Sequence, residues 1–147
     1  MPTRRDILPE HLGSHLTATS MMEVEAPDRA IIRLTAQQNQ NYSGVDRRGE
    51  NVIDLTSPEQ RQTRIDRFQT VVNRPCGGLS INRFKLVNRG EVTTPAILLP
   101  AAGKAGEPAR FLYSAMDLPA RMRWDDLWVP GHIPIAEEFW FIDIGAG

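Results

Sequence analysis

The sequence predicts an α+β protein that is mostly β: a small antiparallel sheet, or a sandwich or barrel, with one packed helix over about residues 57–73 and an extended N-terminal arm. Three observations lead to this prediction. Several short segments alternate apolar and polar residues, which is typical of strands that bury one face. One longer segment begins with a strong helix-start signal. The first 28 residues show no sustained period of either kind.

Length and composition are those of one globular domain. The chain has 147 residues, of which 41% are hydrophobic and 24% are charged, and its formal net charge is −1. These values disfavour wholesale disorder and a surface built mainly for phosphate backbones. Cys76 is the only cysteine, so no intramolecular disulfide can form. We find no secretion signal and no apolar run of membrane-spanning length, and we expect synthesis in the cytoplasm.

We divide the chain at residue 28. Residues 1–28 contain three prolines among scattered polar and apolar residues, which indicates an arm, and residues 29–147 are expected to form a single α+β domain. A first strand is predicted over residues 29–36, where apolar residues alternate. The amide-rich residues 37–49 predict a long loop, or a surface strip that becomes ordered on a partner.

The helix is predicted from both its start and its apolar stripe. A serine, a proline and a glutamate occupy residues 57–59; proline suits the first turn, and glutamate suits the positive end of the helix dipole. Ile65, Phe68 and Val72 recur at helical spacing, so the buried stripe is narrow. We therefore expect this helix to pack one face on a sheet.

A hairpin is predicted next, with strands over residues 79–86 and 91–99. The alternation changes phase near residues 82–83, which predicts a β-bulge. Pro95 cannot donate a ladder hydrogen bond, so its strand should lie at a sheet edge or turn that position outward.

The last elements are a loop over residues 100–109, a strand over residues 111–114 and a terminal strand over residues 139–144. Both faces of the terminal strand are mostly apolar. This pattern is typical of a strand covered on two sides, here by the domain, by its own arm or by a neighbouring subunit.

Candidate catalytic groups are sparse. His132 and a nearby carboxylate, Glu137 or Glu138, could form an acid-base or metal site together with the aspartates at 125–126. The spacing is not diagnostic, because an extended chain directs the two glutamates to opposite faces. Cys76 lies in a loop with no assigned base. We predict no catalytic residue, no metal and no cofactor.

Charge is segregated along the chain. Residues 61–89 carry seven basic residues and one acidic residue, whereas all five charged residues within 124–147 are acidic. This pattern permits docking between copies, or attraction of a nucleic acid or an acidic partner through Arg61, Arg64 and Arg67. The alternative is that the two regions neutralise each other within one domain.

These features together favour a non-enzymatic assembly subunit, most typically a virion or phage component such as a capsid-decorating, neck or tail protein. We expect self-association, or binding to other assembly subunits, through a set of amide-rich-loop and aromatic residues. The alternatives are a small enzyme using His132 and a nucleic-acid-binding module using the arginine-bearing helix. The predicted interface residues are Gln38, Asn39, Tyr42, Trp128, Trp140, Phe141 and Ile142.

Overall fold

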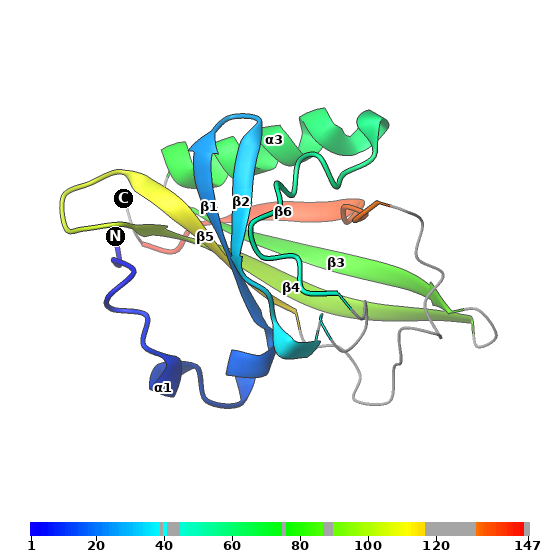
Figure 1. Cartoon of the computed structure of the whole chain (residues 1–147), viewed down its shortest axis with the longest axis horizontal. Coiled ribbons are helices and arrows are strands. Elements are labelled where there is room, and N and C mark those ends of the chain that lie inside the picture. Colours follow the sequence, from blue (N-terminus) through cyan, green and yellow to red (C-terminus); the bar gives the residue numbers. More distant parts are fainter. Residues whose placement is uncertain (39, 41–44, 75, 87–89, 117–131, 146–147) are drawn as a thin grey trace.

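A computed structural model describes residues 1–38, 40, 45–74, 76–86, 90–116 and 132–145 of the chain. Figure 1 shows a twisted sheet with a long helix, α3, on one side of it and the N-terminal segment on the other. In chain order the elements are α1 (Pro9–Leu12), η1 (Gly13–Ala18), β1 (Thr19–Ala26), β2 (Arg29–Leu34), α3 (Pro58–Asn73), β3 (Gly77–Leu86), β4 (Gly90–Ala102), β5 (Ala109–Met116) and β6 (Glu138–Ile142).

The strands form one open antiparallel sheet. Within the described residues it has six strands in the order β2-β1-β5-β4-β3-β6. This confirms the predicted α+β class, mostly β, with one packed helix near residues 57–73. The sheet is open, so its two outermost strands are β2 and β6, at opposite edges.

The larger core lies between α3 and one face of the sheet. From the helix, Phe68, Val71 and Val72 pack against Leu98 of β4 and Leu112 of β5. Val71 and Leu112 are both 0% exposed. The helix is fixed by this apolar contact, as the narrow stripe in the sequence predicted.

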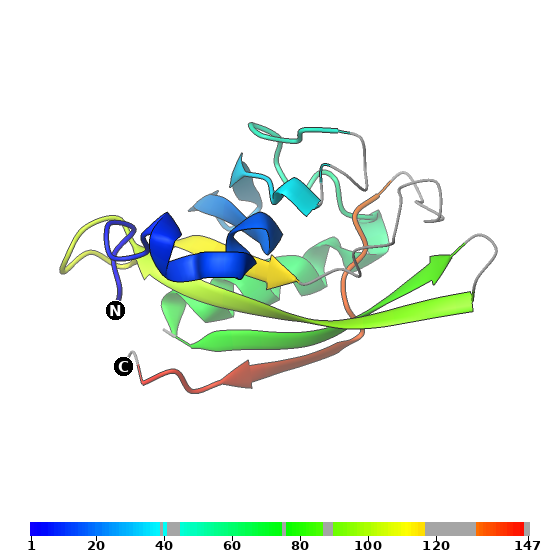
Figure 2. The same cartoon turned by 90° about the horizontal axis from the view of Figure 1, so that it is seen from below.

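A smaller core covers part of the opposite face. Met21, Ala101 and Phe111 are buried there, and Ile7 of the N-terminal segment packs on them. The Arg4 amide donates to the Ala102 carbonyl at 2.8 Å. Figure 2 shows the same arrangement from below, with the N-terminal segment (blue) lying over β5 (yellow).

The predicted arm therefore needs a correction. Residues 19–26 form β1, which pairs with β2 on one side and β5 on the other. The adjacent residues Met21 and Met22 are both buried, in the two different cores. A strand buried on both faces lacks the alternation of apolar and polar residues that marks a half-exposed strand. For that reason the sequence of residues 19–26 was interpreted as part of an arm.

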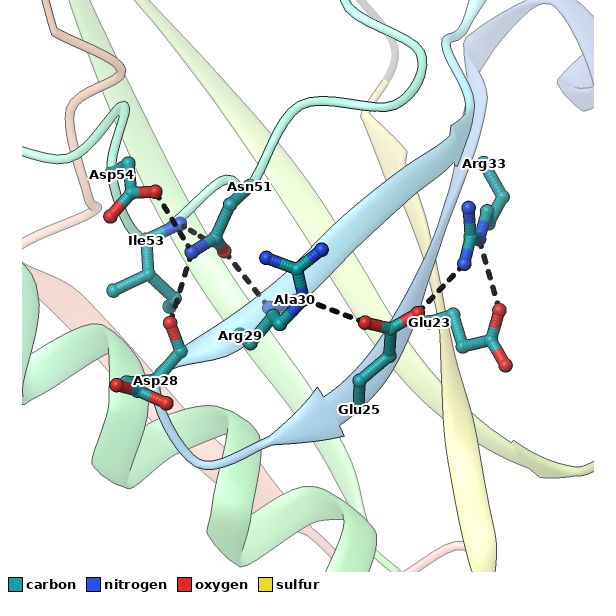
Figure 3. Close-up of polar contacts among 9 residues, drawn as sticks. All are labelled: Glu23, Glu25, Asp28, Arg29, Ala30, Arg33, Asn51, Ile53 and Asp54. Carbon is teal, nitrogen blue, oxygen red and sulfur yellow. Dashed lines mark hydrogen bonds and ion pairs between the residues drawn. The ribbon is translucent and has the colours of Figure 1, made fainter.

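The edge at β2 is covered by the segment that follows it. The amides of Gly49 and Val52 donate to β2 carbonyls, and Ile32 donates to the Glu50 carbonyl. Asn51 fixes this segment with four hydrogen bonds, drawn in Figure 3. Its Oδ1 accepts from Ala30 and Ile53, and its Nδ2 donates to the Asp28 carbonyl and to Asp54.

The β3–β4 hairpin is present, but the predicted bulge is not. The pairing runs without a register shift from Gly78–Leu98 to Leu86–Gly90, so there is no bulge near residues 82–83; apolar residues occur on both faces of this hairpin instead. Pro95 lies in an interior strand, not an edge strand, and is exposed, which is the second of the two predicted arrangements. It is tolerated because the described pairing of β4 with β5 begins only at Ala96.

Replacing Asn51 tests the cover of the β2 edge. Asn51→Ala should lower the free energy of unfolding by about 1–3 kcal/mol, because two backbone amides lose their acceptor. Urea denaturation measures the change. Asn73→Ala is the control, since Asn73 is exposed at the end of α3 and should alter stability by less than about 0.5 kcal/mol. Equal losses in the two variants would contradict this role.

Candidate interaction surface

The strand β6 forms the second edge of the sheet. It pairs with β3 from Ile81–Glu138 to Gly77–Ile142, and no described residue pairs with its other side. This edge differs from the β2 edge, whose backbone groups are met by the segment that ends at Val52. The backbone of β6 is therefore left open on one side among the described residues.

Two glycines of β3 let β6 approach closely. A Cβ at Gly78 would lie 2.5 Å from Cζ of Phe139, and one at Gly77 would lie 2.8 Å from Cγ1 of Ile142. Real Cβ atoms do not approach other atoms so closely, so larger residues would displace β6. Glycines inside a strand are a known sign of close approach, so the sequence does carry a signal for this contact.

Phe139 is held from the helix side. The guanidinium of Arg67 lies 4.5 Å from the centre of its ring, which is within the range of a cation–π contact. Phe141 meets the same ring edge-on, with 5.2 Å between ring centres. The α3 side of β6 is thus an aromatic pair capped by an arginine.

The residues that lead into β6 are tied to α3 through their backbone. Arg64 donates from Nη2 to the Pro134 carbonyl at 2.8 Å and from Nη1 to the Ile133 carbonyl at 3.3 Å. Arg67 donates from Nη1 to the Ala136 carbonyl at 2.6 Å. These bonds join the helix to a segment about 70 residues further along the chain.

Arg64 is an unusual anchor because it is buried. It is 8% exposed, and burial, with a smaller contribution from nearby Arg67, lowers its pKa to about 10. The side chain still carries its charge at neutral pH. Its described partners are oxygens of neutral groups, the two carbonyls and the Thr56 hydroxyl at 2.5 Å, so the segment before β6 compensates a buried charge.

The face opposite α3 is apolar near β6. Trp140 pairs with Leu79, which pairs with Ile97, and these side chains share a face because directly paired residues point the same way. Trp140 is 47% exposed. Ile142 lies two residues further along the same face of β6. We call Trp140, Ile142, Leu79 and Ile97 the apolar strip.

Further towards β2, beside the smaller core that the N-terminal segment covers, this face carries ion pairs. Glu23 accepts from Arg33 at 2.9 Å and from Arg110 at 2.7 Å. Glu25 pairs with Arg33 at 2.9 Å and with Arg29 at 2.7 Å, as Figure 3 shows. Exposed pairs contribute little stability, but they keep this part of the face polar. The apolar strip is therefore confined to the β6 side.

The structure brings together only some of the predicted interface residues. Trp140, Phe141 and Ile142 lie together on β6. Gln38 follows β2, at the opposite edge of the sheet from β6. The other three lie outside the described residues; they are Asn39, Tyr42 and Trp128.

The three helix arginines do not form an exposed basic stripe. Arg61 donates from Nε to the Thr56 carbonyl at 3.1 Å, and Arg64 and Arg67 hold the segment before β6. Arg83 of the basic region forms an ion pair with Glu138 of the acidic region. The two charged regions therefore meet within one chain, which was the alternative interpretation of the charge pattern.

The candidate catalytic groups do not assemble either. His132 and Glu137 are exposed, and Glu138 is engaged by Arg83; the aspartates at 125–126 lie outside the described residues. In the described ranges, no three His, Cys, Asp or Glu side chains are grouped as metal ligands would be. Burial raises the pKa of the Cys76 thiol, which opposes formation of a reactive thiolate.

Comparison with known proteins identifies a protein family that matches most of the chain. A family model described as a PAS domain matches residues 1–115, a range that takes in β1 to β4, α3 and most of β5. The matched range ends before β6 begins. No curated protein matches the sequence. No helix in the described part of the chain is long and apolar enough to cross a membrane.

Replacing Arg64 tests the connection between α3 and β6. Arg64→Ala should lower the free energy of unfolding by about 2–4 kcal/mol, because the Ile133 and Pro134 carbonyls lose a charged donor. Arg64→Lys should recover only part of this loss, since an ammonium lacks the forked geometry. Chemical denaturation measures both. Arg74→Ala, at an exposed position at the end of α3, should change stability by less than about 0.5 kcal/mol; a comparable loss there would argue against the anchor.

Replacing Gly78 tests the close approach of β6. Gly78→Ala should displace Phe139 and raise amide hydrogen exchange at residues 138–142 by about tenfold or more. Ser80→Ala, two residues along the same face of β3, is the matched control and should leave exchange unchanged. Unchanged exchange in Gly78→Ala would show that β6 does not depend on the glycine.

Proposed function

We propose, because this chain belongs to the PAS domain family, that it is a sensory or signalling domain that acts through contact with other proteins. The single observation that carries the proposal is the family match over residues 1–115. PAS domains commonly mediate protein–protein interaction and dimerisation. We further propose that β1 to β6 act as one domain.

The same match corrects the predicted function. A PAS domain is not a virion or phage structural protein, so the prediction of a capsid-decorating, neck or tail protein is wrong, and so is its description as a structural protein of a virion or bacteriophage. The predicted antiparallel β structure fits the fold. The alternatives, a small enzyme using His132 and a nucleic-acid-binding module using the arginine-bearing helix, are replaced by the same finding and are not proposed again.

For the mode of contact, we propose self-association through the apolar strip. Two features support it. The strip contains Trp140, which is 47% exposed, and tryptophan is among the residues that contribute most to interfaces. The ion pair of Glu138 with Arg83 lies beside the strip, because Glu138 is two residues before Trp140 on the same face of β6. An apolar centre beside a polar margin is the usual composition of an interface.

Two substitutions, each of which replaces an exposed apolar side chain with glutamate, test this contact. Trp140→Glu should weaken self-association at least about tenfold, because a charge would be buried at the centre of the contact. Sedimentation velocity over a range of chain concentrations measures it. Leu34→Glu is the control: Leu34 is 40% exposed and lies at the opposite edge, so its substitution should have no effect. A chain that stays monomeric throughout, or an equal effect of both substitutions, would refute self-association through the strip.

A further inference from the structure

We propose that the open edge of β6 binds an extended segment of another protein, with a basic residue near each end of that segment. This inference goes beyond the proposed function, because it concerns the backbone edge of β6 and a different partner rather than self-association through the apolar strip. It rests on three properties of β6: an edge that no described residue pairs with, exposed aromatic side chains and flanking carboxylates.

Among the described residues, the edge lacks three of the devices that protect a terminal strand: a proline or lysine, a bulge and a covering segment. Residues 137–143 contain no proline, lysine or glycine, and the β3–β6 pairing shows no bulge. Such an edge presents unpaired N–H and C=O groups, which can accept one more strand. The β2 edge gives the contrast, since residues 49–52 already cover it.

The side chains of β6 leave room for a neighbour on both faces. Trp140 and Phe141 point to opposite faces and are 47% and 50% exposed. An added strand would place a side chain about 5 Å from each of them, Cβ to Cβ. Apolar or β-branched residues at the central positions of the partner would therefore cover both aromatic rings.

The charges at the two ends of β6 specify the ends of the partner. Glu137 and Asp143 flank the strand and are exposed, and no described basic residue forms an ion pair with either. Glu138 differs, because it is already paired with Arg83. Asp143 accepts one hydrogen bond, from the Gly145 amide at 2.8 Å, and its charge has no described cationic partner. Six residue steps of extended chain, about 20 Å, separate the two carboxylates. A partner with Lys or Arg six residues apart would meet both.

The same charges disfavour a second copy of this chain at the edge. Two β6 strands paired antiparallel about Trp140 would place Glu137 of each directly opposite Asp143 of the other. Like charges in directly opposed positions destabilise strand pairing. Registers that avoid this clash are shifted by at least two residues and pair less of the strand. The carboxylates therefore discourage self-pairing while they favour a basic partner.

The test uses two short peptides and the full chain. The first is Lys-Val-Thr-Val-Thr-Val-Lys, whose palindromic sequence makes its direction irrelevant; the second replaces both lysines with glutamates. Titration of the isotope-labelled chain, followed by NMR, should show that the lysine peptide shifts the amide signals of residues 138–142. The glutamate peptide should bind at least about tenfold more weakly, since attraction at both ends becomes repulsion.

A charge-reversed chain is the matched control. The double variant Glu137→Lys, Asp143→Lys should reverse the preference, binding the glutamate peptide about tenfold more tightly than the lysine peptide. Its sedimentation should match that of the unchanged chain, so a failed peptide test leaves self-association standing. Absence of binding by either peptide, equal binding of both, or shifts confined to residues outside 138–142 would overturn the proposal.

Discussion

An open β-sheet has two edges, and each edge leaves half of its strand's backbone groups without a partner in the sheet. The arrangement of this molecule follows from how it treats those edges. At β2 the following segment supplies hydrogen bonds through Gly49 and Val52. At β3 the chain returns after β5 and adds β6. Addition of β6 covers the edge of β3 but makes β6 the new edge strand, and the exposed residues of that strand include two aromatic ones.

Holding β6 in place requires contacts beyond its pairing with β3, because no residue of β6 is fully buried. Those contacts come from α3. Arg64 and Arg67 bind the carbonyls of the segment that leads into the strand, and Arg67 covers Phe139. The helix that forms the main core thus also positions the exposed strand.

The family assignment shows how weakly composition constrains function. A near-neutral chain with an amide-rich loop and an exposed aromatic strand fits an assembly protein and a PAS domain equally well, because both present apolar surface to other proteins. The same holds for the arginines. Along the sequence they suggested a surface for anions, yet Arg64 is buried and binds neutral carbonyls. Which way a side chain points in the fold decides its role.

The sequence by itself determined the local elements whose signals lie within a few residues: the helix near residues 57–73, the β3–β4 hairpin and the aromatic terminal strand. These signals are capping residues, periodic apolar positions and turn residues, all of which act over short distances. Only the tertiary structure decided that β1 lies inside the sheet, because burial on two faces erases alternation. Likewise, the partners of Gly78 and Arg64 lie about 60 and 70 residues away along the chain, and a contact over that separation is set by the fold as a whole.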